Sequence, residues 1–125
     1  MEISPKMQQQ LAQFEQLRQQ VQMIANQRMN LEAKVKELEI ALEELDKVDE
    51  ETPIFRSVGS LLIKAKNRTE VIEQLKEEKE TSEVRVKAVK KQEEQLKGRY
   101  DELQQKLQES LKKYQAQSMG QNLSL

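Results

Sequence analysis

The sequence contains no cysteine and no histidine, and it has no tryptophan. Without thiols the chain cannot form disulfides or thiolate metal sites, and without imidazole it lacks the most common general base. It also has no glycine-rich phosphate loop and no nucleophile elbow. We therefore expect no catalytic residues, no cofactor, no metal ion and no enzymatic activity.

Aromatic residues, glycine and proline are scarce as well. Only 3% of the 125 residues are aromatic, and there are 3 Gly and 2 Pro, whereas 34% are charged and 36% hydrophobic. Such a chain is too polar and too poor in aromatic side chains to form one compact core. A composition dominated by Glu, Lys, Gln, Leu and Ala is instead typical of long helices and coiled coils.

Neither sign of charge prevails, since 21 Lys and Arg stand against 22 Asp and Glu. A formal net charge of -1 produces no field that would attract nucleic acid or an anionic membrane. No apolar run approaches the roughly 18 residues of a membrane span, and Met1–Pro5 does not resemble a signal peptide. We expect a cytoplasmic protein that binds neither nucleic acid nor membranes.

Two charged runs are the strongest candidates for ionic sites. The acidic run Glu43–Glu51 lacks the Asp-x-Asp-x-Asp-Gly loop that wraps calcium. The basic run Lys87–Lys91 is followed by Glu93 and Glu94, and it contains no aromatic residue on which a base could stack. Both runs are better explained as solvated helix surface and linker.

A first long helix is predicted over about residues 5–47. Ser4 is suited to the N-cap and Pro5 to the first helical position. From there apolar residues recur every 3.5 residues, which is typical of a coiled coil, and only Gln10 and Arg28 interrupt them. We call the a and d positions of these heptads the seam. Its members in this helix are Ile3, Met7, Gln10, Phe14, Leu17, Val21, Ile24, Arg28, Leu31, Val35, Leu38, Leu42 and Leu45.

The linker and hairpin, about residues 48–66, contain the only stretch that is typical of β-strands. Val58 and Leu61 flank a Gly59-Ser60 loop, and Gly at the first central position suits a type II′ turn, which needs positive φ there. An isolated two-stranded hairpin is marginal in water and leaves both edges open, so we expect it to pair with hairpins of other chains. The residues expected to mediate this oligomerisation are Ile54, Phe55, Val58, Gly59, Leu61, Leu62 and Ile63.

A second helix is predicted over about residues 68–118. Asn67, with Glu70 three residues later, resembles a capping box. Gly98 falls at an outward f position, and Gly120 is a plausible helix stop, followed by a flexible tail at 119–125. The seam positions of this helix are Ile72, Leu75, Lys79, Ser82, Val86, Val89, Glu93, Leu96, Tyr100, Leu103, Leu107, Ser110, Tyr114 and Gln117.

Two helices of similar length around a short hairpin can run back alongside each other. The predicted fold is therefore an all-α-dominated single unit, residues 1–125, built as a long antiparallel two-helix coiled coil with one central β-hairpin. In this register Leu17 lies near Tyr100. Arg28 and Glu93 fall within about one layer of each other, and we hypothesise that these two polar residues set the register.

The helix ends remote from the hairpin, residues 3–14 and 107–119, form what we call the tip. The tip has more apolar side chains than a two-helix seam can bury, and its seam includes the polar Ser110. One interpretation is an adaptable surface for extended apolar segments of other proteins. The alternative is an ordinary coiled-coil core followed by a disordered tail. The candidate substrate-binding residues are Ile3, Met7, Leu11, Phe14, Leu107, Leu111, Tyr114 and Met119.

The order of helix, hairpin and helix, with Val58–Lys64 in the hairpin and Lys91-Gln92-Glu93-Glu94-Gln95-Leu96 in the second helix, resembles the prefoldin family. A single hairpin is similar to the β-type subunits of that family, because α-type subunits carry two. The resemblance covers essentially the whole chain. The hairpin motif and the Lys-Gln-Glu stretch are its most specific parts.

This resemblance implies a hexamer of two α-type and four β-type subunits, in which the hairpins form an intersubunit double β-barrel. It also implies an ATP-independent co-chaperone that holds non-native polypeptides between its tips and passes them to a cytosolic chaperonin. Ile54–Lys64 would then form the barrel, and the tip residues would hold the substrate. The competing hypothesis is a structural coiled-coil spacer or scaffold whose hairpin dimerises and whose tip binds one folded partner.

Overall fold

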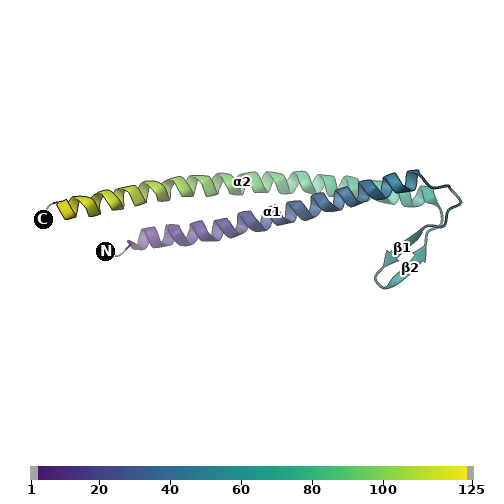
Figure 1. Ribbon diagram of the computed structural model, residues 1–125, viewed down its shortest axis with the longest axis horizontal. Helices are drawn as coiled ribbons and strands as arrows, with labels where there is room; N and C mark the ends of the chain where they lie inside the picture. Colours follow the sequence, from purple (N-terminus) through teal and green to yellow (C-terminus); the bar gives the residue numbers. More distant parts are fainter. Residues whose placement is uncertain (1–2, 124–125) are drawn as a thin grey trace. The chain divides into compact units, whose positions relative to one another are not determined.

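The computed structural model describes residues 3–123, with side chains up to Gln117. Helix α1 (Pro5–Asp46) is followed by strand β1 (Phe55–Val58), strand β2 (Leu61–Lys64) and helix α2 (Arg68–Leu123) (Figure 1). These elements divide into two compact units. The terminal unit comprises residues 1–26 and 90–125, and the hairpin unit comprises residues 27–89.

Both helices begin at the predicted caps. The Ser4 side-chain hydroxyl accepts a hydrogen bond of 3.1 Å from the backbone N–H of Met7. The Asn67 side-chain oxygen accepts one of 2.8 Å from the backbone N–H of Glu70. Each bond satisfies an N–H that has no partner within the first turn of its helix.

The helices end less predictably than they begin. Helix α1 stops at Asp46, one residue before the predicted end. Helix α2 continues to Leu123, past residue 118 and past Gly120, so the prediction that Gly120 ends it was wrong. A glycine inside a helix costs only about 1 kcal/mol relative to alanine, and no proline follows to force an end. Residues 124–125 of the predicted tail lie outside the described part of the chain.

Burial follows the predicted seam. From Met7 to Leu45 in α1 and from Ile72 to Tyr114 in α2, every seam residue is buried or half-buried, and Gln117 is exposed. The polar members obey the same pattern, since Ser82 is 3% exposed and Glu93 6% exposed. Val71, at the g position beside Ile72, is also buried. The 3.5-residue repeat therefore predicted which face of each helix is covered.

In the terminal unit, the two helical segments run in opposite directions. The rings of Phe14 and Tyr100 stack with centroids 4.8 Å apart. Further along α1, Leu17 shares a hollow with Leu103, and Ile24 shares one with Leu96. From Leu17 to Ile24 the α2 residue that shares the hollow changes from Leu103 to Leu96, so the pairing is antiparallel.

In the hairpin unit, β1 and β2 form a two-stranded antiparallel sheet (Figure 1). Its register pairs Val58 with Leu61, the two residues that flank the predicted two-residue loop, and Phe55 with Lys64. Gly59 has a φ of 61°, and among the described residues no other amino acid has positive φ. One positive φ at the first central position is the signature of a type II′ turn.

Neither helix has a stretch within residues 3–123 that combines the length and apolarity needed to cross a membrane.

Candidate functional site

The hairpin carries the largest group of exposed apolar side chains in the described chain. Their exposed fractions are 56% for Phe55, 55% for Val58, 63% for Leu61, 74% for Leu62 and 50% for Ile63. Apolar side chains in a folded domain normally lie against other apolar groups. All five belong to the predicted oligomerisation set.

Ile54 and Gly59 complete the predicted oligomerisation set. Ile54 lies half-buried at the base of the hairpin, where its carbonyl accepts a 2.8 Å hydrogen bond from the N–H of Ala65. Gly59 lies exposed at the turn.

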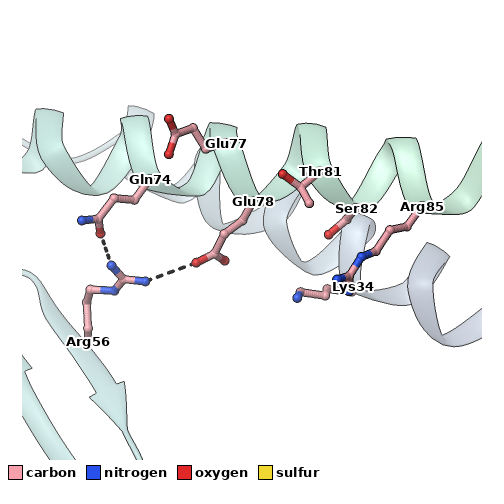
Figure 2. A pocket seen from close by; sticks show the side chains of 8 residues that line it. All are labelled: Lys34, Arg56, Gln74, Glu77, Glu78, Thr81, Ser82 and Arg85. Atoms are coloured by element: carbon pink, nitrogen blue, oxygen red, sulfur yellow. Dashed lines mark hydrogen bonds and ion pairs between the residues drawn. The ribbon is translucent and has the colours of Figure 1, made fainter.

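Arg56 connects the hairpin to α2. Figure 2 shows its guanidinium reaching from β1, where it donates hydrogen bonds to the side-chain oxygens of Gln74 and Glu78. The bond to Glu78 measures 3.4 Å. Gln74 and Glu78 lie one helical turn apart on α2, so one guanidinium fork can reach both. The sequence analysis did not predict this contact, although Arg56 stands among the apolar residues of the hairpin. A lone charge among apolar side chains needs a polar partner, so its position in the sequence could have indicated such a contact.

A second arginine joins the end of α1 to the start of α2. Arg68 donates a 2.7 Å hydrogen bond to the backbone carbonyl of Leu45, and its guanidinium lies 3.6 Å from the carboxylate of Asp46. The last carbonyls of a helix have no partner within the helix and carry partial negative charge. Arg68, which follows the hairpin in the sequence, therefore caps the C-terminal end of α1. The sequence analysis missed this contact.

A shallow pocket of about 380 Å³ lies beside Arg56 in the hairpin unit (Figure 2). It is lined by Lys34, Arg56, Gln74, Glu77, Glu78, Thr81, Ser82 and Arg85. Its three basic side chains are opposed by two carboxylates, so the lining does not favour a ligand of either charge. No group of acidic side chains in the described part of the chain is arranged to hold a metal ion.

The predicted tip residues separate into two groups in the terminal unit. Met7 and Leu107 are buried, at 7% and 5% exposed, and Phe14 and Tyr114 are half-buried. These four occupy a positions of the seam. The exposed members are Ile3 at 38%, Leu11 at 38% and Leu111 at 41%. Met119 lies in α2, but its side chain is outside the described part of the structure.

In the α1 segment of the terminal unit, most of the charged side chains belong to one ion pair. Arg18 donates two hydrogen bonds to the carboxylate of Glu15, at 2.6 and 3.1 Å. These bonds lower the pKa of Glu15 and raise the pKa of Arg18 relative to their ordinary values. Both side chains are about half exposed, so the pair lies on the surface and not within the seam.

The polar seam residues Arg28 and Glu93 each have an ion pair within their own helix. Arg28 lies 3.1 Å from Glu32, and Glu93 lies 3.9 Å from Lys97. Their predicted role in setting the register stays a prediction.

Residues 8–114 match the family model for a prefoldin subunit. This chain belongs to the prefoldin family. The family was predicted from the hairpin and the second helix, and the match confirms it. Prefoldins are chaperones.

Known prefoldin sequences resemble the chain over most of its length. It is 48% identical over 110 residues to the prefoldin subunit beta of Archaeoglobus fulgidus, covering 88% of this chain and 94% of that protein. It is 40% identical over 110 residues to the prefoldin subunit beta of Methanosarcina acetivorans, covering 88% and 93%. The similarity therefore includes both helices and the hairpin.

A solved prefoldin structure shares the fold. The crystal structure of the prefoldin beta subunit from Thermococcus strain KS-1 superimposes with a TM-score of 0.76 at 31% identity. The match covers 88% of this chain and 96% of that one. Two long helices joined by one two-stranded hairpin are thus a prefoldin architecture, and the similar chains are named beta subunits.

Proposed function

We propose that this chain is the β-type subunit of an ATP-independent holdase that captures non-native polypeptides at its tip and delivers them to a cytosolic chaperonin. It works in the cytoplasm within a hexamer of two α-type and four β-type subunits. The hairpins of the six chains close into a double β-barrel, and the tips remain free for substrates.

The exposed apolar hairpin carries the assembly part of this proposal. Leu62 is 74% exposed and Leu61 63% exposed in the single chain, and the two-stranded sheet has two open edges. Burying apolar side chains contributes about 25 cal/mol for each Å² removed from water. Closure into a barrel would bury these side chains and pair both edges at once. The relatives are themselves named as subunits, which agrees with assembly.

The tip supports the substrate-holding part. Ile3, Leu11 and Leu111 are exposed there, while Met7 and Leu107 fill the seam behind them. Exposed apolar side chains can contact the apolar segments that an unfolded polypeptide leaves uncovered. Holding an unfolded chain in this way requires no bond-making group and no nucleotide.

The experiment follows aggregation by light scattering. The purified chain and an α-type partner are mixed with several unrelated, chemically denatured proteins in the absence of ATP. We expect suppression of aggregation for all of them, since apolar contact does not depend on one sequence. Suppression for a single protein, or for none, would contradict the proposal and favour the scaffold.

A further inference from the structure

The terminal unit contains two adjoining hollows on one flank of its helix pair. The first, about 300 Å³, is lined by Gln13, Gln16, Leu17, Gln20, Arg99 and Leu103. The second, about 240 Å³, is lined by Ile24, Gln92, Gln95, Leu96 and Arg99. Arg99 borders both, so they adjoin, and we call them together the amide groove. Its side chains all come from d, g and c positions, whereas the exposed tip residues Leu11 and Leu111 occupy e positions on the other flank.

The amide groove has an apolar floor and a rim of glutamines, to which the charged side chain of Arg99 also contributes. Its floor residues, such as Leu17 and Leu96, are half-buried, and its glutamines are exposed. A glutamine side chain offers one carbonyl acceptor and two N–H donors and carries no charge. These are the groups that complement a peptide bond, which also has one donor, one acceptor and no net charge.

The glutamines are unevenly distributed along the chain. In α1 they stand at positions 8, 9, 10, 13, 16, 19, 20, 22 and 27, and residues 28–46 contain none. The later part of α1 has Glu and Lys at its exposed positions instead. Coiled-coil stability does not require this difference, because charged residues serve equally well on exposed faces. The neutral polar surface is therefore a specific property of residues 8–27 of α1, whereas the α2 residues of the terminal unit include many Lys and Glu.

We propose that the amide groove binds an extended segment of a non-native polypeptide through hydrogen bonds to its backbone, independently of its sequence. The proposal rests on the holdase function above and gives it a second contact site. From Gln13 to Ile24 the helix rises roughly 16 Å, which matches about five residues of extended chain. A helical segment would not use the rim, because its backbone groups already bond to one another. An extended segment leaves those groups available to the glutamines.

The absence of cysteine from the chain permits a site-specific test. A benzophenone maleimide is attached to Gln16→Cys, Gln95→Cys or, as a matched control, Gln19→Cys, which is exposed at an f position away from the groove. Each full-length variant is assembled with a cysteine-free α-type partner, mixed with a denatured cysteine-free protein and irradiated. We expect several-fold more cross-linked polypeptide from positions 16 and 95 than from position 19.

A second measurement tests the hydrogen bonds themselves. The probe is a fluorescein-labelled peptide of about ten alternating Leu and Ser residues, together with the same peptide N-methylated at alternate amides. Wild type should bind the methylated peptide more weakly, and Gln16→Met should weaken binding of the unmethylated peptide roughly fivefold, as expected for one lost hydrogen bond. Gln19→Met should have no effect.

The outcomes separate the groove from the holdase function. Equal cross-linking at positions 16, 95 and 19, with binding of denatured protein intact, would overturn the amide groove alone. Tighter binding by Gln16→Met, or indifference to N-methylation, would overturn backbone recognition. Failure of the assembled protein to bind any denatured polypeptide would overturn both the groove and the proposed function.

Discussion

Two glycines in this chain have opposite roles. Gly59 lies at the hairpin turn with φ of 61°, a conformation that costs an L-amino acid about 1–2 kcal/mol. Gly98 lies within α2, where glycine is less favourable than alanine by about 1 kcal/mol. At both positions an added Cβ would meet no side chain and no backbone from another part of the chain within 4 Å. Backbone conformation alone therefore decides the effect of substituting either.

Substituting alanine at these two positions should shift stability in opposite directions. Gly59→Ala should make the N–H of Ala65, which bonds to Ile54 across the hairpin, exchange with solvent roughly tenfold faster. Gly98→Ala should raise the thermal midpoint of helix unfolding, measured by circular dichroism, because it removes the glycine penalty. Unchanged or slower exchange in Gly59→Ala, or a lower thermal midpoint in Gly98→Ala, would contradict the backbone argument.

The Glu15–Arg18 pair predicts a small pH dependence of stability. The folded-state pKa of Glu15 lies below its ordinary value, so the stabilisation is present above that ordinary value and is lost as the pH falls through the lowered pKa. Wild type should unfold at a slightly higher temperature than Glu15→Gln at pH 7, and at the same temperature in strong acid. The effect should be small because both side chains are well exposed.

Glu102→Gln removes another exposed carboxylate of the terminal unit and is the control for net charge. If it reproduced the pH profile of Glu15→Gln, the dependence would come from overall charge and not from the ion pair.

At the scale of whole elements, the sequence predicted those features of the helices and the hairpin that depend on residues close together in the chain. The turn chemistry of Gly59 and the 3.5-residue repeat were enough for the hairpin register and for the buried face of each helix. The contacts of Arg56 with α2 and of Arg68 with the end of α1 join residues far apart in sequence. No local pattern specifies such contacts. The end of α2 also escaped prediction, because the helical cost of one glycine is small compared with the whole helix.

The tip residues were predicted as one set, but heptad position divides those that lie within the helices. Ile3 is exposed although it was assigned to the seam, because it precedes the start of α1. Met7 and Leu107 stand at a positions and are buried, whereas Leu11 and Leu111 stand at e positions and are exposed. The same heptad pattern could have made this distinction from sequence. The amide groove could not have been found in this way, because glutamine on an exposed face predicts only a solvated surface.

The proposed assembly depends on the hairpin. Leu62→Asp places a charge on its most exposed apolar position, where barrel closure would bury it. We expect size-exclusion chromatography to show loss of the complex with the α-type partner, with helix content unchanged by circular dichroism. Val84→Asp is the matched control, since Val84 is 63% exposed on α2, and it should leave assembly intact. Equal loss of assembly in both variants would indicate a general effect of charge.

At the scale of the molecule, the two units have different surfaces. Charged side chains are exposed on both units. The hairpin unit presents exposed apolar strands, and the terminal unit presents a few exposed apolar residues together with the glutamines of α1. This contrast is the basis for assigning assembly to one unit and substrate binding to the other.

Removing most of the tip should separate these two roles. A chain lacking residues 1–10 and 112–125 should still assemble with its α-type partner, because the hairpin is intact. It should suppress aggregation of denatured proteins much less than the full chain in the light-scattering assay, because it keeps Leu11, Leu111 and the amide groove but loses the rest of the tip. Loss of assembly on this truncation would show that the roles have been assigned to the wrong units.

Native mass spectrometry tests the central claim most directly. The chain is measured alone and then with an α-type partner, so that the stoichiometry of the complex is read from its mass. The account predicts a hexamer of two α-type subunits and four copies of this chain. A stable dimer of this chain that does not incorporate the α-type partner would contradict it.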